Sequence, residues 1–145
     1  MAMPVQSLCT RSLLMAQAYV TNFMNLNETG FQDALSDEVK AVWARIEGDF
    51  ELEKKEIEGK AAVAEFCHDN FFGITNQFDL VESGYSSFGP HAMLNCVVNQ
   101  NKIDRDGVER RYHIISKTKL EFKEEGGDLK IIKIWERTSK DLIPN

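Results

Sequence analysis

Residues 109–137 read ERRYHIISKTKLEFKEEGGDLKIIKIWER and carry the clearest pattern in the chain. In their first half, a mostly apolar set alternates with a mostly charged one; the first set is Tyr112, Ile114, Ser116, Thr118, Leu120 and Phe122. A period of two predicts a strand whose two faces differ in burial. Gly126 and Gly127 favour a reversal, because glycine readily adopts the positive φ that a tight turn needs. The chain then returns through Ile131, Ile132, Ile134 and Trp135, which predicts a long hairpin with one face to be covered.

Three helical patterns upstream supply that cover. Ser7 can cap a helix that runs to about residue 26, along which apolar residues recur at helical spacing: Cys9, Leu13, Ala16, Val20 and Phe23. Thr29 can cap a short second helix. A third helix follows Gly59 and repeats one face through Val63, Phe66, Cys67, Asn70, Phe71 and Ile74.

Strands are predicted between and after these helices, at 39–46, 50–58, 77–81 and 91–99. Serines and glycines at 83–90 predict a bulge or loop within this series. The order is helix, helix, strand, strand, helix and four strands. Helices segregated to one side of a mostly antiparallel sheet make an α+β architecture.

The composition is that of one globular domain over residues 1–145, with 43% hydrophobic residues. A net charge of −6 without a basic run argues against a nucleic-acid partner, and no apolar run is long enough to span a membrane. The three cysteines, Cys9, Cys67 and Cys96, fit no disulfide framework and no metal-ligand spacing. We therefore expect a reducing compartment, the cytoplasm or the nucleus, and no metal or other cofactor.

The order of the elements resembles the nuclear transport factor 2-like superfamily, also called SnoaL-like or the cystatin-like cone, over about residues 7–137. The local carriers are the helix with Tyr19, the run ALSDE at 34–38, the run IEGK at 57–60 with Phe66 after it, and the hairpin of Phe122, Gly127, Leu129 and Trp135. The resemblance implies a strongly curved sheet that wraps around three helices (α-α-β-β-α-β-β-β-β) and leaves a cone-shaped cavity.

Ketosteroid isomerases belong to this superfamily, and their pattern can be compared position by position. Tyr19 matches their oxyanion donor in the first helix. Their aspartate base corresponds to Trp43 here, and their second aspartate to Thr118. Because an indole offers only a donor N–H, it cannot take up a proton. The resemblance therefore implies no isomerase activity, and we expect no catalytic residue.

Aromatic residues on the predicted helices and strands suit an apolar cavity with few polar groups. The alternative for any single member is ordinary core packing. The expected ligand-binding residues are Tyr19, Phe23, Trp43, Phe66, Ser116, Thr118 and Trp135. His68, with Glu65 one turn before it, falls off the apolar stripe of the third helix, which favours an exposed position over a catalytic pair.

Three functions remain open at this point. The first is a non-catalytic module that binds a small apolar ligand or another molecule. The second is an enzyme of the isomerase, dehydratase or cyclase type acting on a small apolar substrate, and the third is a protein-binding adaptor like the transport factors. We also expect a homodimer formed through the outer sheet face, where His113 and Ile115 stand among Arg111, Lys117 and Lys119.

Overall fold

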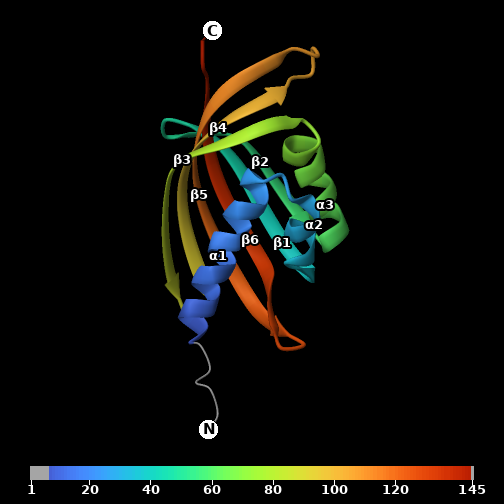
Figure 1. Ribbon diagram of the computed structural model, residues 1–145, viewed down its shortest axis with the longest axis vertical. Coiled ribbons are helices and arrows are strands. Elements are labelled where there is room, and N and C mark those ends of the chain that lie inside the picture. Colours follow the sequence, from blue (N-terminus) through green and yellow to red (C-terminus); the bar gives the residue numbers. More distant parts are fainter. Residues whose placement is uncertain (1–6, 145) are drawn as a thin grey trace.

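The computed structural model describes residues 7–144, and its elements follow the predicted order (Figure 1). The helical elements are α1 (Leu8–Met24), α2 (Glu28–Asp33), α3 (Lys60–Cys67) and the π-helical turn η1 (His68–Phe72). The strands are β1 (Leu35–Glu47), β2 (Phe50–Glu58), β3 (Thr75–Phe88), β4 (His91–Ile103), β5 (Glu109–Glu125) and β6 (Asp128–Leu142).

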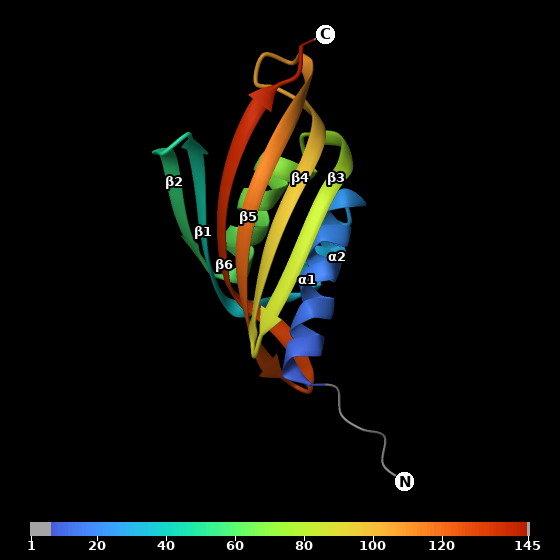
Figure 2. The ribbon, with the colours of Figure 1, turned by 90° about the vertical axis from the view of Figure 1, so that its left-hand side faces the viewer.

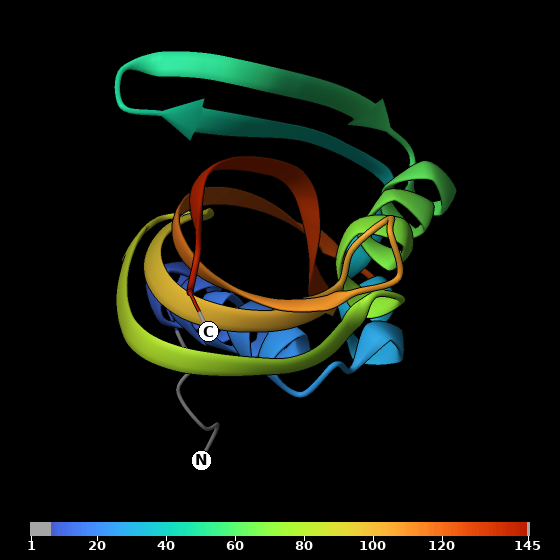
Figure 3. The ribbon, with the colours of Figure 1, turned by 90° about the horizontal axis from the view of Figure 1, so that it is seen from above.

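The six strands form one sheet in the order β2-β1-β6-β5-β4-β3. All neighbours are antiparallel except β1 and β6, which run parallel. Figure 3 shows how strongly the sheet curves, and Figure 2 shows the helices gathered on one side of the strands. The predicted α+β cone with a mostly antiparallel sheet is therefore confirmed.

The β5–β6 hairpin has the predicted strands, turn and faces. Gly126 and Gly127 have φ of 60° and 89°, and Glu125 pairs with Asp128 across the turn. On β5, alternate residues are buried as expected, among them Ile114, Thr118, Leu120 and Phe122. These side chains form the inner wall of the cone.

Helix α1 is fixed to the sheet by polar contacts at its N-terminal half. The Ser7 side chain caps the helix by accepting from the Thr10 N–H. Buried Ser12 donates to the Gly89 carbonyl at 2.8 Å, and Arg11 pairs with Glu124 at 2.7 Å. Because these contacts set the rotation of α1, they also direct Tyr19, two turns further on, toward the sheet.

Two local predictions were wrong. The stretch from Ser83 to Ser87 is regular strand, because as part of the edge strand β3 it pairs with β4 through residues such as Cys96. The irregularities lie earlier, between Thr75 and Gln77 and between Leu80 and Glu82. The cap of α2 is Asn27, whose side chain accepts from the Gly30 N–H, and not Thr29.

The core lies between α1, α2, α3 and the inner sheet face. Its largest fully buried side chains include Phe31, Leu35, Leu94, Leu120, Ile131 and Ile134. Phe66, which the sequence places in this core, is only half-buried and packs against Trp43 at a ring distance of 5.0 Å. Across residues 7–144, the helices are too short or too polar to cross a membrane.

Candidate functional site

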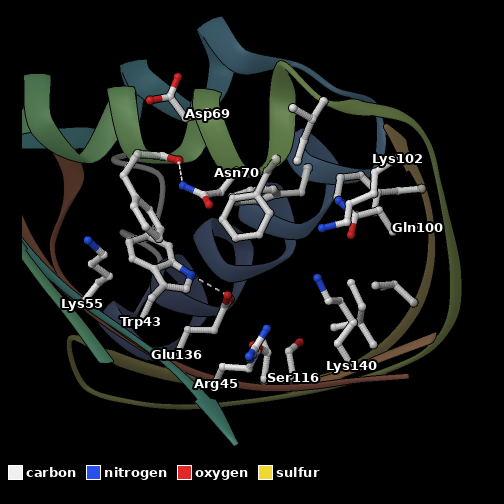
Figure 4. Close-up of a pocket in the computed structure, with 18 of the residues that line it drawn as sticks. Trp43, Arg45, Lys55, Asp69, Asn70, Gln100, Lys102, Ser116, Glu136 and Lys140 are labelled. Atoms are coloured by element: carbon white, nitrogen blue, oxygen red, sulfur yellow. Dashed lines mark hydrogen bonds between the residues drawn. The ribbon is translucent and has the colours of Figure 1, made fainter. Parts of the chain in front are cut away.

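A cavity of about 1560 Å³ occupies the inside of the cone. Its walls come from α1, α3, η1 and all six strands of the sheet. Apolar side chains such as Phe66, Phe71 and Ile74 line one part, and charged side chains line another (Figure 4). The cone is therefore open, and its volume exceeds the roughly 300–1,000 Å³ of ordinary small-molecule pockets.

Glu136 of β6 is the carboxyl group at the centre of this cavity (Figure 4). Its Oε2 accepts a hydrogen bond from the Trp43 indole N–H at 2.6 Å, and its Oε1 accepts one from the Thr118 hydroxyl at 2.9 Å. The sheet register produces this group directly. Trp43 is the partner of Glu136 across the parallel β1–β6 pairing, and Thr118 is its partner across the antiparallel β5–β6 pairing.

The surroundings of Glu136 favour its neutral form. Withdrawal from bulk water raises the pKa of the Glu136 carboxyl, and the hydrogen bonds from Thr118 and Trp43 lower it by a smaller amount. The residue as a whole is half-buried, because the cavity leaves part of it accessible. A carboxyl with a raised pKa that a ligand can reach is typical of general acid–base sites.

Tyr19 of α1 adds a hydroxyl group to the same cavity. The hydroxyl is buried and has no hydrogen-bond partner within the part of the chain that the structure describes. Burial raises the pKa of Tyr19 well above its usual value, and the charge of Glu136 raises it further. Tyr19 is therefore a protonated donor without an acceptor, which is the arrangement needed to bind a ligand oxygen.

The thiols near the cavity do not suit nucleophilic chemistry. Burial raises the pKa of Cys96 to about 11 and that of Cys67 further, and the charge of Glu136 adds to both shifts. Thiols in this state are not ionised at neutral pH. His68 is exposed and pairs with Glu28 at 2.7 Å, not with Glu65. Among residues 7–144, no cluster of three His, Cys, Asp or Glu side chains could hold a metal ion.

Most of the residues expected to bind a ligand meet in this cavity. Its lining includes Tyr19, Phe23, Trp43, Phe66, Ser116 and Thr118. Trp135 is not among the lining residues, so the prediction that it binds the ligand was wrong. Its ring lies against the cations of Lys119 and Arg137, on the opposite face from the cavity.

One extra residue in β6 explains both the wrong prediction for Trp135 and why the sequence did not indicate Glu136 as a cavity residue. Phe122 of β5 pairs with Ile131, yet Glu121 pairs with Lys133, so Ile132 is an extra residue in β6. A one-residue bulge moves every later side chain to the other face. Strict alternation from Leu129 and Ile131 would place position 135 inward, whereas the bulge turns position 136 inward. The sequence signal was the adjacent pair Ile131-Ile132, which breaks the alternation.

Comparisons with known proteins give structural matches alone. The chain matches no protein-family model, and no curated protein matches its sequence. Among solved structures, a proposed polyketide cyclase of Xanthomonas campestris pv. campestris has a TM-score of 0.69 at 15% identity, with 90% of this chain and 92% of that chain covered.

Two further structures are similar at the same level. A proposed ketosteroid isomerase of Kribbella flavida has a TM-score of 0.61 at 14% identity, with 97% of this chain and 87% of that one covered. A nuclear transport factor 2-like protein of Burkholderia xenovorans has a TM-score of 0.60 at 10% identity, with 90% of each chain covered. At these identities the likeness concerns the fold, which hosts many activities.

Proposed function

This chain has the nuclear transport factor 2-like fold, and we propose that its cone binds a small, largely apolar carbonyl compound and moves a proton on it. The observation that carries the proposal is Glu136, a carboxyl group of raised pKa held in the cavity by Trp43 and Thr118. This function belongs to the enzyme alternative of the sequence analysis. The non-catalytic alternative rested on the absence of the carboxyl pair of the isomerases, and Glu136 supplies one carboxyl group in the cavity.

Glu136 is the proposed base. A carboxylate of ordinary pKa is a weak base, and a pKa nearer to neutrality makes proton abstraction more favourable. The two hydrogen bonds keep the carboxylate in one orientation and support its ionised form. In this arrangement Trp43, which cannot itself take up a proton, serves to position the group that can.

Tyr19 is the proposed donor to the substrate oxygen. When Glu136 takes a proton from the carbon beside a carbonyl, the electron pair of that C–H bond moves toward the carbonyl oxygen and forms an enolate. The free hydroxyl of Tyr19 can donate to this oxyanion. Return of this proton from Glu136 to another carbon completes an isomerisation. Its transfer to a neighbouring hydroxyl group, which leaves as water while the enolate electrons form a C=C bond, completes a dehydration.

A proton-exchange assay tests this proposal without knowledge of the natural substrate. With 2-tetralone in D₂O, we expect the protein to accelerate exchange at C1, followed by NMR, and Tyr19→Phe to lower the rate by about 10²-fold. The matched control is Tyr85→Phe on β3, since Tyr85 is not among the described residues that line the cavity.

The outcomes separate the three functions. Quenching of Trp43 fluorescence by 2-tetralone without exchange would return the weight to the non-catalytic ligand-binding alternative. Neither binding nor exchange would favour the protein-binding adaptor.

We also infer that the protein forms a homodimer through the outer face of β4 and β5. Met93 and Ile115 are 49% and 48% exposed there, and Val97 lies beside Ile115 in the register. We expect a dimer at micromolar concentration by sedimentation, and a monomer for Ile115→Lys, which adds charge to both copies. The control Leu52→Lys on β2 should stay dimeric; a monomeric wild type would contradict the inference.

A further inference from the structure

Three cationic side chains from three different strands lie in the same cavity as Glu136. They are Arg45 of β1, Lys102 of β4 and Lys140 of β6. In Figure 4, Lys140 and Lys102 flank one end of the cavity and Arg45 lies between Glu136 and Ser116. The lining as a whole is mixed in charge, because it also includes acidic residues: Glu53, Glu56, Glu65, Asp69, Asp104, Asp106 and Glu136.

These cations have few carboxylate partners. Lys102, whose side chain is 14% exposed, lies 3.5 Å from Asp104. Asp104 is already shared, because it accepts from Arg110 at 2.9 Å and from the Tyr112 hydroxyl. Within residues 7–144, no carboxylate lies within 4.0 Å of Lys140 or of Arg45.

The pKa of Lys140 reflects the electrostatic cost of placing these cations together. Partial burial lowers the pKa of its ammonium group to about 8, with further lowering by Lys102 and Arg45. The ring of Tyr112 offsets part of this cost, since Lys140 and Lys102 lie 4.6 Å and 5.0 Å from its centre. An aromatic face holds a cation in place without using up its N–H donors.

Of the described acidic residues that line the cavity, only Asp104 forms an ion pair with one of the three cations. Asp69 lies across the cavity from Lys140 in Figure 4. Asp106 is engaged by Arg110 at 2.7 Å. Glu136 accepts its hydrogen bonds from Trp43 and Thr118, which are neutral donors. An anion entering the cavity would thus meet unused ammonium and guanidinium donors beside an apolar wall.

We propose that Lys140, Lys102 and Arg45 bind an anionic group of the ligand, so that the cone takes an amphipathic organic acid. The apolar body of this ligand lies between Trp43, Phe66 and Phe71, and its carboxylate or phosphate lies against the three cations. The proposal deepens the proposed function, because it names the class of ligand for the same cavity.

A matched pair of fluorescent probes tests the anion site. 8-Anilinonaphthalene-1-sulfonate and N-phenyl-1-naphthylamine share an aromatic body, and only the first carries an anionic group. We expect the sulfonate to bind about tenfold more tightly at pH 7, since a hydrogen bond to a charged group contributes at least that factor. Lys140→Met and Arg45→Met should each remove about that advantage, by weakening the sulfonate more than the neutral probe.

The control is Lys117→Met on the outer face of β5, which should leave the affinity for both probes unchanged. Thermal melts confirm that each variant is folded. Competition by decanoate and by decyl phosphate then shows which anionic group is preferred, with 1-decanol as the neutral reference.

The two proposals fail in different ways. The anion site alone would be overturned if the two probes bound with equal affinity. It would also be overturned if the sulfonate still bound more tightly in both Lys140→Met and Arg45→Met. Competition by 1-decanol that is as strong as competition by decanoate and by decyl phosphate would also overturn the anion site. If neither probe binds, the cone does not take apolar ligands, and the proposed function is overturned as well.

Discussion

Glu136→Gln should lower the rate of 2-tetralone exchange by about 10²–10⁴-fold, the usual contribution of a general base. An amide has the size of a carboxyl group but cannot accept the proton. The site can accommodate it, because the amide oxygen can accept from Trp43 while the amide nitrogen donates to the Thr118 oxygen. The loss would therefore report missing chemistry and not a collapsed cavity.

The same substitution should make the protein more stable at neutral and alkaline pH. The folded-state pKa of Glu136 is raised, so the stability that its neutral form provides is complete below the unfolded value of about 4.5. That stability is lost as the pH rises through the folded-state pKa. Glutamine does not titrate, so the midpoint of thermal unfolding of the variant should exceed that of the wild type by an amount that grows as the pH rises from about 4.5 through the folded-state pKa and is constant above it.

An exposed glutamate provides the control for both measurements. Glu109→Gln, at the exposed start of β5, should change neither the exchange rate nor the pH dependence of unfolding. Retention of the exchange rate within threefold in Glu136→Gln would show that another group is the base. A variant that melts below the wild type at pH 8 would contradict the electrostatic argument.

Phe31→Ala should cost about 3–5 kcal/mol of unfolding free energy, the usual range for a buried phenylalanine. Phe31 is 1% exposed, and its ring centre lies 5.0 Å from that of Phe23 and 5.5 Å from that of Phe72. It packs between α1 and η1 from its place on α2, so its removal would leave a cavity where three helical elements meet. Total stability is about 5–15 kcal/mol for most domains, so much of it would be lost.

Urea denaturation measures this effect, with two reference variants. Phe88→Ala should cost less than about 0.5 kcal/mol, because Phe88 is 84% exposed at the end of β3. The loss of unfolding free energy for Phe66→Ala should lie between the losses for Phe31→Ala and Phe88→Ala. Phe66 is half-buried and lines the cavity, as expected of a ligand-binding residue, so its ring contributes less to the core than that of Phe31. A loss below about 1 kcal/mol for Phe31→Ala would mean that the packing of α2 is not as described.

The sequence by itself determined the elements and the faces of β5. Alternation in β5 is strict, so the inner position of Thr118 and the outer position of Lys117 follow from the order of residues alone. The turn glycines and the spacing of α1 are equally local. These features were predictable because each depends on interactions between residues that are close in the chain.

Only the tertiary structure decided the chemistry of the site. Whether Trp135 or Glu136 faces the cone depends on one extra residue in β6, which is defined by its pairing with β5. The contact of Glu136 with Trp43 depends on the parallel pairing of β1 with β6, 93 residues apart. Pairing between distant strands also brings three cations into one cavity: Arg45, Lys102 and Lys140. Strand register is set by pairing between distant segments, so a local signal such as Ile131-Ile132 can mark a break in the alternation but cannot specify the pairing.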